Sequence, residues 1–151
     1  MSLSVSNSVV RLLLLANVEA WRCRASNIEP VHFWIACLKM ADTSFAGKLL
    51  DAGGTPEDCK EQAEQSNRLL AFLEMDSDMA AERRRTIRGK LLRGQPPREI
   101  PENGPEYLHR SESSRRLFEI AMRKAEARGS TTLLPSDIAE SLFDMKLVSL
   151  E

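Results

Sequence analysis

An internal duplication constrains the fold of this 151-residue chain more than any other feature of its sequence. At an offset of 105 residues, which sets Leu12 beside Leu117, small and apolar positions recur without a gap over roughly thirty positions. The matching pairs are Leu12 with Leu117, Ala16 with Ala121, Ala20 with Ala125, Ile28 with Leu133, Pro30 with Pro135 and Leu38 with Phe143. Within the same window, Ile35 and Glu140 differ in character. Each copy predicts a long helix, a short polar turn, an apolar residue, a proline and a second helix.

The spacing of apolar residues predicts helices along the chain. In residues 9–24 they recur three and four positions apart, as on one face of a helix, and Ser8 is the expected N-cap. No segment alternates apolar and polar residues as a half-buried strand does. The expected helices are residues 9–24, 31–40, 44–52, 56–73, 78–93, 111–128 and 135–146. We therefore expect an all-α fold, a pseudo-twofold duplicated helical repeat of about eight helices in one compact domain.

The duplication also predicts how this domain is divided. Repeat one is expected at about residues 8–54 and repeat two at about residues 111–151. Charged helices and a proline-rich loop are inserted between them, at about residues 55–110. Four prolines within residues 94–107 predict that this loop is the internal joint of the domain.

Charge and hydropathy exclude several classes of protein. Twenty-one Lys and Arg residues against 22 Asp and Glu give a net charge of −1, which argues against a general polyanion binder. The longest apolar run, residues 9–16, is interrupted by Arg11 and falls short of the roughly 20 residues that span a bilayer. The amino terminus has no basic stretch typical of a secretory signal, and the three cysteines have no CxxC spacing. We expect a cytoplasmic protein that makes no membrane contact.

The sequence contains no motif for catalysis or cofactor binding. The Gly-Lys pairs at 47–48 and 89–90 lack the other residues of a phosphate-binding loop. Nucleophile-elbow, zinc-protease and dinucleotide-binding motifs are absent as well. The two histidines, His32 and His109, have no neighbouring ligands at metal-site spacing. We therefore expect no catalytic residues, no cofactor and no metal; an enzyme would need a polar site where Glu29, His32 or His109 converge.

The duplicated pattern resembles the N-terminal repeat domain of the Clp/Hsp100 AAA+ unfoldases, the Clp N domain. Residues 10–53 and 111–144 carry the resemblance, including Asn-Ile-Glu-Pro-Val-His-Phe-Trp at 27–34 and Leu-Leu-Pro-Ser-Asp-Ile at 133–138. Together they cover about half of the chain. The resemblance implies a pseudo-twofold globule of eight helices that rides on an ATP-driven hexamer. Such a domain has no catalysis of its own and binds adaptor or substrate proteins for unfolding, disaggregation or proteolysis.

The same resemblance implies that the AAA+ ATPase rings belong to the same protein, as parts of a longer chain. At the 105-residue offset, the counterpart of the 44–52 helix would occupy residues 149–157. The last helix of repeat two is therefore expected to be missing from these 151 residues. A free-standing Clp adaptor is the alternative.

The family pattern also implies a binding surface at the start of the second helix in each repeat. The positions are Pro30, Val31, His32, Pro135, Ser136 and Asp137. In the family an acidic residue commonly precedes the histidine, and in some members these acids help to bind phosphorylated arginine. Here Val31 and Ser136 stand at those positions and Asp137 replaces the second histidine, so this chain departs from the phosphoarginine-reading pattern. His32 fits either a core histidine bonded to a neighbouring loop or a ligand or switch residue.

A shorter match concerns residues 29–34, Glu-Pro-Val-His-Phe-Trp. They resemble the second helix of the N-domain in the type VI secretion branch of Clp ATPases. That branch captures a helix of the contractile sheath, which makes a sheath-binding N-domain an alternative function.

An arginine cluster within residues 78–93 is the second candidate interaction site. Arg84 and Arg85 lie four and three positions before Arg88, so the three side chains share one helix face. They are interpreted either as solvated surface or as a basic docking face for an acidic ATPase ring or substrate. Pairing within the fold is a further alternative, with the acidic residues Glu57, Asp58, Glu61 and Glu64 as partners. Nucleic-acid binding is disfavoured because the chain is net acidic and lacks interleaved aromatic residues.

Overall fold

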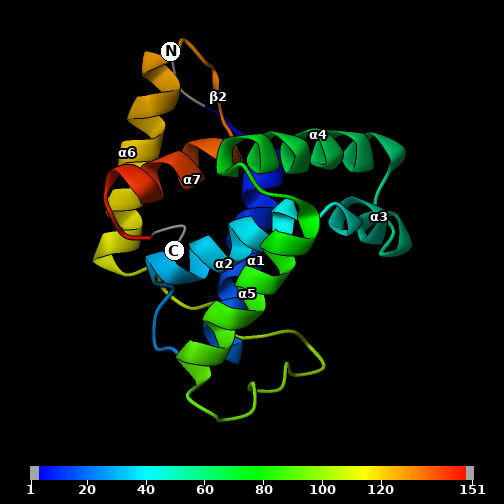
Figure 1. Ribbon diagram of the computed structural model, residues 1–151, viewed down its shortest axis with the longest axis vertical. Coiled ribbons are helices and arrows are strands. Elements are labelled where there is room, and N and C mark those ends of the chain that lie inside the picture. The colour runs from blue at the N-terminus through cyan, green and yellow to red at the C-terminus, as the bar shows by residue number, and fades with distance from the viewer. Residues whose placement is uncertain (1–3, 149–151) are drawn as a thin grey trace.

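The computed structural model describes residues 4–148 and confirms the predicted all-α fold (Figure 1). Seven helices and two very short strands lie in this part of the chain. They are β1 Ser4–Val5, α1 Asn7–Arg22, α2 Pro30–Ala41, α3 Ser44–Asp51, α4 Pro56–Leu73, α5 Ser77–Leu92, α6 Glu112–Ala127, β2 Thr132–Leu133 and α7 Pro135–Asp144. Each expected helix is present, with ends that shift by about two residues at most. The expected counterpart of α3, at residues 149–157, lies outside the described residues.

The two repeats share one architecture. In each repeat, the short segment before the first helix pairs with the segment before the second helix of the other repeat. α6 begins and ends 105 residues after α1, and Pro30 and Pro135 begin α2 and α7 at the same offset. Val5 of β1 pairs in parallel with Leu133, which precedes α7. The amino-terminal strand of repeat one is therefore bound by repeat two.

The reciprocal contact is also present. An isolated parallel bridge joins Ile28, which precedes α2, to Arg110, which precedes α6. The backbone N–H of Ser6 donates to the Leu133 carbonyl (3.2 Å), and that of Ser111 donates to the Ile28 carbonyl (3.0 Å). The pseudo-twofold relation thus extends to individual backbone hydrogen bonds.

The long helix of each repeat begins at an equivalent serine cap. The hydroxyls of Ser6 and Ser111 each accept the backbone N–H three residues on, at 3.1 Å. The expectation that Ser8 caps α1 is wrong. Ser8 is buried inside the first turn, where its hydroxyl donates to Glu61 of α4 at 2.6 Å.

The core forms where the α1–α2 hairpin packs on the α6–α7 hairpin. Phe33 of α2 meets Phe118 of α6 edge-on, with ring centroids 5.1 Å apart. Trp34 of α2 meets Phe143 of α7 in the same way at 5.3 Å. α2 is therefore the central helix, and ten of its twelve residues are buried.

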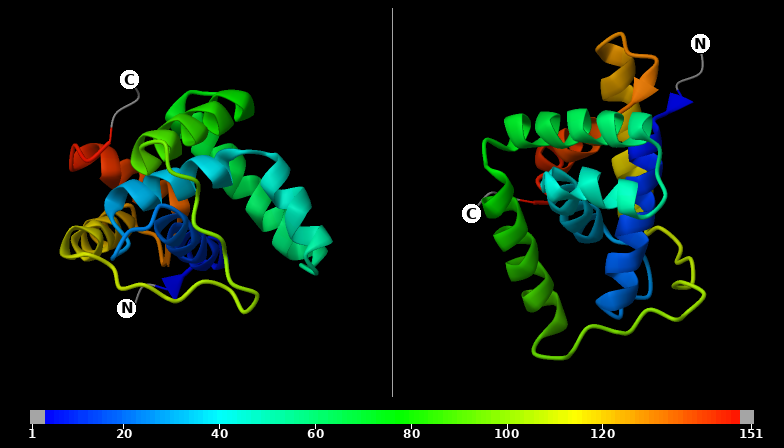
Figure 2. Two further views of the ribbon diagram at one scale, coloured as in Figure 1. Left: turned by 90° about the horizontal axis from the view of Figure 1, so that it is seen from below. Right: turned by 90° about the vertical axis from the view of Figure 1, so that its right-hand side faces the viewer.

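The inserted helices lie on this core at different depths. α4 packs against α2 and α7 and covers one side of the core, while α3 packs on α4. Both views of Figure 2 place α5 at the edge of the molecule, outside α2. Among residues 4–148, no helix is long and apolar enough to cross a bilayer.

The proline-rich loop is bound to the outer face of α1. We call residues 98–108 the strap. The Asn17 side chain donates to the Glu106 carbonyl (3.2 Å) and accepts the Leu108 N–H (2.8 Å). The indole N–H of Trp21 donates to the Glu99 carbonyl at 3.0 Å. These hydrogen bonds attach the loop to α1. Figure 1 shows the loop at the bottom of the molecule.

Candidate functional site

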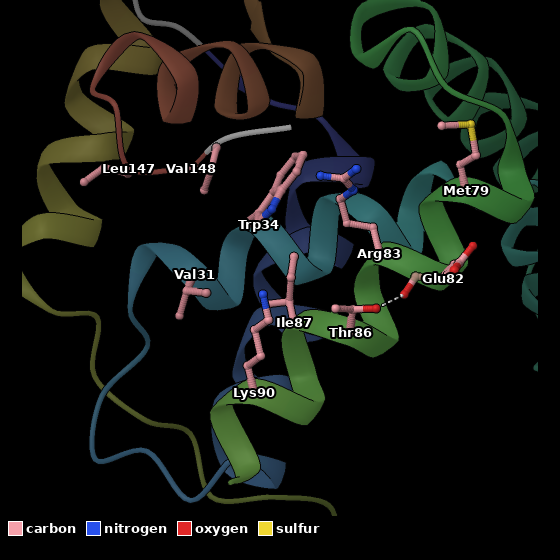
Figure 3. Close-up of a pocket in the computed structure, with 10 residues that line it drawn as sticks. All are labelled: Val31, Trp34, Met79, Glu82, Arg83, Thr86, Ile87, Lys90, Leu147 and Val148. Carbon is pink, nitrogen blue, oxygen red and sulfur yellow. Dashed lines mark hydrogen bonds between the residues drawn. The ribbon is translucent and has the colours of Figure 1, made fainter. Parts of the chain in front are cut away.

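A groove of about 470 Å³ lies between α2, α5 and the segment that follows α7 (Figure 3). We call it the α2–α5 groove. Its lining residues are Val31, Trp34, Met79, Glu82, Arg83, Thr86, Ile87, Lys90, Leu147 and Val148. Six of these ten side chains are apolar, and the charged ones all come from α5. An apolar lining with charged groups on one wall is typical of a surface that binds another protein.

Local sequence explains why α2 presents Val31 and Trp34 to this groove. Pro30 at the first helical position presets the helix, and Glu29 before it is extended. Val31 and Trp34 are three positions apart and so lie on the same side of α2. Val31 is half-buried and Trp34 is 2% exposed, so the indole forms a floor beneath the groove.

The other long wall is one face of α5. Met79, Arg83, Ile87 and Lys90 follow one another at spacings of four, four and three residues. From Met79 to Lys90 this face extends over about 16 Å at 1.5 Å per residue. The groove therefore has the length of about three helical turns.

The structure divides the positions expected at the start of each second helix. Pro30, His32, Pro135 and Asp137 are buried. Of the set, Val31 lines the α2–α5 groove, and Ser136 is half-buried elsewhere on α7. The six residues therefore do not form one exposed binding surface.

His32 and Asp137 occupy equivalent positions and perform the same local task. His32 Nδ1 accepts the backbone N–H of Glu29 at 2.8 Å, and Asp137 accepts the N–H of Leu134 at 2.9 Å. Each closes a capping box at the start of its helix. Burial lowers the pKa of His32 to about 4, and the nearby carboxylate of Glu19 offsets this only in part. The core-histidine interpretation of His32 therefore matches its position.

The arginine cluster does not form one exposed basic face. Arg88 turns toward α1 and makes a bidentate ion pair with Glu19, whose side chain is 2% exposed. Arg84 is half-buried, and its Nε is a buried donor with no hydrogen-bond partner. Burial and then the neighbouring Arg88 lower the pKa of Arg84. Of the three, Arg85 alone is exposed, so the docking face proposed for them is reduced to one side chain.

The acidic residues of α4 do not supply the partner of Arg88. Glu61 pairs with Arg11 of α1, and Gln62 accepts a 2.8 Å bond from the same guanidinium. This network joins α4 to α1. Charge pairing within the fold is therefore present, but with partners other than the expected ones.

The residues expected at an enzyme site lie outside the groove. Glu29, His32 and His109 do not line it. Within residues 4–148, no three His, Cys, Asp or Glu side chains lie close enough to hold a metal ion. The groove residues can bury apolar side chains and pair with charges, which is the chemistry of recognition.

A second hollow of about 440 Å³ follows the outer face of α6. Its lining is Glu112, Arg115, Arg116, Glu119, Ile120 and Arg123. Five of the six are charged and of mixed sign, as on an ordinary solvated helix. It is the weaker candidate.

Most of the groove was not predicted from the sequence. Met79, Thr86 and Lys90 on α5 were not singled out, nor were Leu147 and Val148 after α7. The spacing of Met79, Arg83 and Ile87 was the available signal, because it puts two apolar side chains on one face of a charged helix.

Comparison of the chain with protein-family models, curated proteins and solved structures finds no match. Inference about function therefore depends on the duplicated fold, the α2–α5 groove and the sequence resemblance.

Proposed function

We propose that this chain is a non-catalytic protein-interaction domain that delivers adaptor or substrate proteins to a Clp/Hsp100 AAA+ unfoldase. The observation that carries the proposal is the α2–α5 groove, an apolar recess with charges along one wall. Burial of apolar side chains would supply the affinity, and the α5 charges would orient the partner and raise its association rate.

The duplicated fold supports the unfoldase part of the proposal. The resemblance implies two copies of a helical hairpin whose second helix begins with proline. Copies of this kind occur here at a single offset and exchange their strands. Val31 of α2 belongs to the repeat motif and also lines the groove, so one residue of the family pattern lies at the candidate site.

The first test is the reading frame beyond the codon for Glu151. Two nucleotide-binding motifs of the G-x-x-x-x-G-K-[ST] type within a few hundred codons would support the N-domain of an unfoldase. A stop codon would contradict it and favour a free-standing adaptor.

The second test asks whether the groove binds protein. Thr86 lies exposed on the groove wall, so a photoreactive benzoylphenylalanine there should crosslink to bound partners in the source cells. The matched control carries the same group at Met122, which is exposed on α6 and lines neither hollow. Crosslinks specific to position 86 that contain a Clp ATPase, or one of its clients or adaptors, would support the proposal. Identical products from both positions would contradict it.

A sheath-binding N-domain of the type VI secretion branch is the second candidate function. Two residues of the 29–34 segment, Val31 and Trp34, line the groove, which is long enough for about three turns of a helix. Titration with a synthetic sheath helix separates the two candidates. The groove variant Val31→Glu should weaken binding of such a helix about tenfold or more, and Met122→Glu on α6 should not.

A further inference from the structure

α5 contributes very little to the core, although it forms a wall of the groove. Of its sixteen residues, Ala80 alone is buried. α2 is the element on which it packs, whereas α4 contacts α1, α2, α3 and α7. A helix with one buried residue gains little free energy from tertiary packing, and an isolated helix of this length is marginal in water.

Polar anchors near both of its ends hold α5 in place. Near its start, the Ser77 hydroxyl accepts the Thr43 backbone N–H (3.0 Å) and donates to Asp42 (3.0 Å). Near its end, Arg88 makes the bidentate pair with Glu19 of α1. Hydrogen bonds and ion pairs need close and aligned atoms, whereas apolar contact does not. These polar contacts are therefore lost together when the helix moves outward.

Both ends of α5 are joined to short non-helical segments, residues 74–76 after α4 and residues 93–97 before the strap. Glu74, in the turn after α4, has a left-handed backbone conformation (φ 53°) and ends that helix. After Arg93, also left-handed (φ 51°), the chain has no helix until Glu112. α5 can therefore move without displacing α4 or α6.

α5 contributes the small residue Ala80 and the partly buried Ile87 to the core. The large, fully buried side chains come from α1, α2, α4, α6, α7 and the segments that precede α2 and α7. Removal of α5 would hydrate Glu19 and uncover the side of α2 that bears Val31 and Trp34.

We propose that α5 is a separately opening wall of the α2–α5 groove, latched by the buried Glu19–Arg88 pair, so that its opening regulates access to the apolar side of α2. The regulatory part rests on the proposed function, whereas the opening itself is a property of this chain alone. In the closed state the groove has the shape described above, and in the open state α2 offers a wider apolar surface.

Hydrogen exchange of the 151-residue chain, read by mass spectrometry, tests the opening. Released α5 would not persist as an isolated helix, so its amides would exchange without unfolding of the whole domain. We expect peptides from α5 to exchange at least about a hundredfold faster than peptides from α2 and α6. Equal protection in all three helices would overturn the proposal.

Two variants test the latch. Arg88→Met leaves Glu19 unpaired in the closed state, so α5 should exchange at least about tenfold faster than in the parent protein while α6 is unchanged. Arg85→Met, an exposed arginine on the same helix, is the matched control and should leave α5 exchange unaltered. Acceleration in α6 equal to that in α5, or an equal effect of both variants, would overturn the latch.

These measurements contain no partner, so they separate the two proposals. Fast exchange of α5 together with crosslinks that do not depend on position would leave the opening intact and contradict the binding function. Crosslinks specific to position 86 together with full protection of α5 would support the binding function and contradict the opening.

Discussion

At the residue scale, the duplication places two different side chains, His32 and Asp137, at equivalent positions with the same hydrogen-bonding role. His32 and Asp137 each accept the backbone N–H of the residue that precedes the helix proline. An imidazole can accept through Nδ1 only while that nitrogen carries no proton, whereas a carboxylate accepts when ionised. Asp137 also pairs with Arg128, which compensates its buried charge. Protonation of His32 is therefore expected to break the capping box of α2.

Stability is expected to fall in mild acid because of His32. Its pKa is about 4 in the folded chain and about 6.5 when unfolded, so the stabilising effect is complete above pH 6.5 and is lost as the pH falls toward 4. Between pH 7.5 and pH 5 the free energy of unfolding should decrease by about 2 kcal/mol from this group. Urea titrations at several pH values measure it. His32→Asn keeps a hydrogen-bond acceptor and should flatten the pH dependence; an unchanged slope would contradict the assignment.

Asn17 is the second residue whose role can be isolated. Its amide makes two hydrogen bonds to the strap and is 3% exposed. Asn17→Ala should cost about 1–3 kcal/mol, because two hydrogen bonds from this buried side chain to the strap are lost. The expected result is faster tryptic cleavage after Arg98. The matched control, Asn103→Ala at an exposed loop position, should leave the cleavage rate unchanged.

At the element scale, helices α1 and α5 have opposite relations to the core. One side of α1 is packed into the core, and the strap covers part of its outer face. α5 fully buries Ala80 alone, so under our proposal local helix propensity and the polar anchors determine whether it stays in place. Changes in helix propensity should therefore matter more on α5 than on any helix of the core.

Gly89→Ala is expected to strengthen α5. No atom lies within 4 Å of a Cβ added at this helical glycine, so the substitution costs no packing. Alanine favours the helix by about 0.5–1 kcal/mol, which should slow amide exchange in α5 about two- to fivefold. Gly54→Ala provides the contrast, because its Cβ would lie 2.8 Å from the Leu49 carbonyl oxygen. That variant should lower the melting temperature, and a gain in both variants would contradict this explanation.

At the scale of the whole molecule, the exchanged strands make the repeats depend on each other. β1 of repeat one pairs with repeat two, and Ile28 of repeat one pairs with the residues that precede α6. The aromatic contacts of α2 with α6 and α7 cross the same boundary. Neither hairpin buries its apolar side alone.

A fragment of residues 1–54 should therefore lack stable structure. Its α2 would expose Phe33 and Trp34, which the second repeat covers in the intact chain. Circular dichroism should show little helix in the fragment and a cooperative thermal transition in the full chain. A cooperative transition in the fragment would mean that repeat one folds independently.

Much of the fold could be predicted from local sequence. Proline at the first position of α2, α4 and α7, and the three- and four-residue spacing in α1, act within one or two turns. The duplication was visible because both copies keep the same length between the long helix and the proline. The strands were not predicted, since two residues cannot display an alternating pattern.

The candidate site was predicted only in part, because charges and grooves depend on residues far apart in the sequence. Arg88 resembled an exposed docking residue until the fold placed Glu19, 69 positions earlier, beside it. The groove joins Val31, Ile87 and Val148, which no local pattern connects.

The sequence by itself thus determined the helices, their order and the duplication, because hydrogen bonds and side-chain contacts within a helix act between near neighbours. The tertiary structure alone decided which side chains were desolvated. Since burial sets the free energy of a charge or an apolar surface, it also decided that Arg88 pairs with Glu19 and that Val31 and Trp34 line the groove.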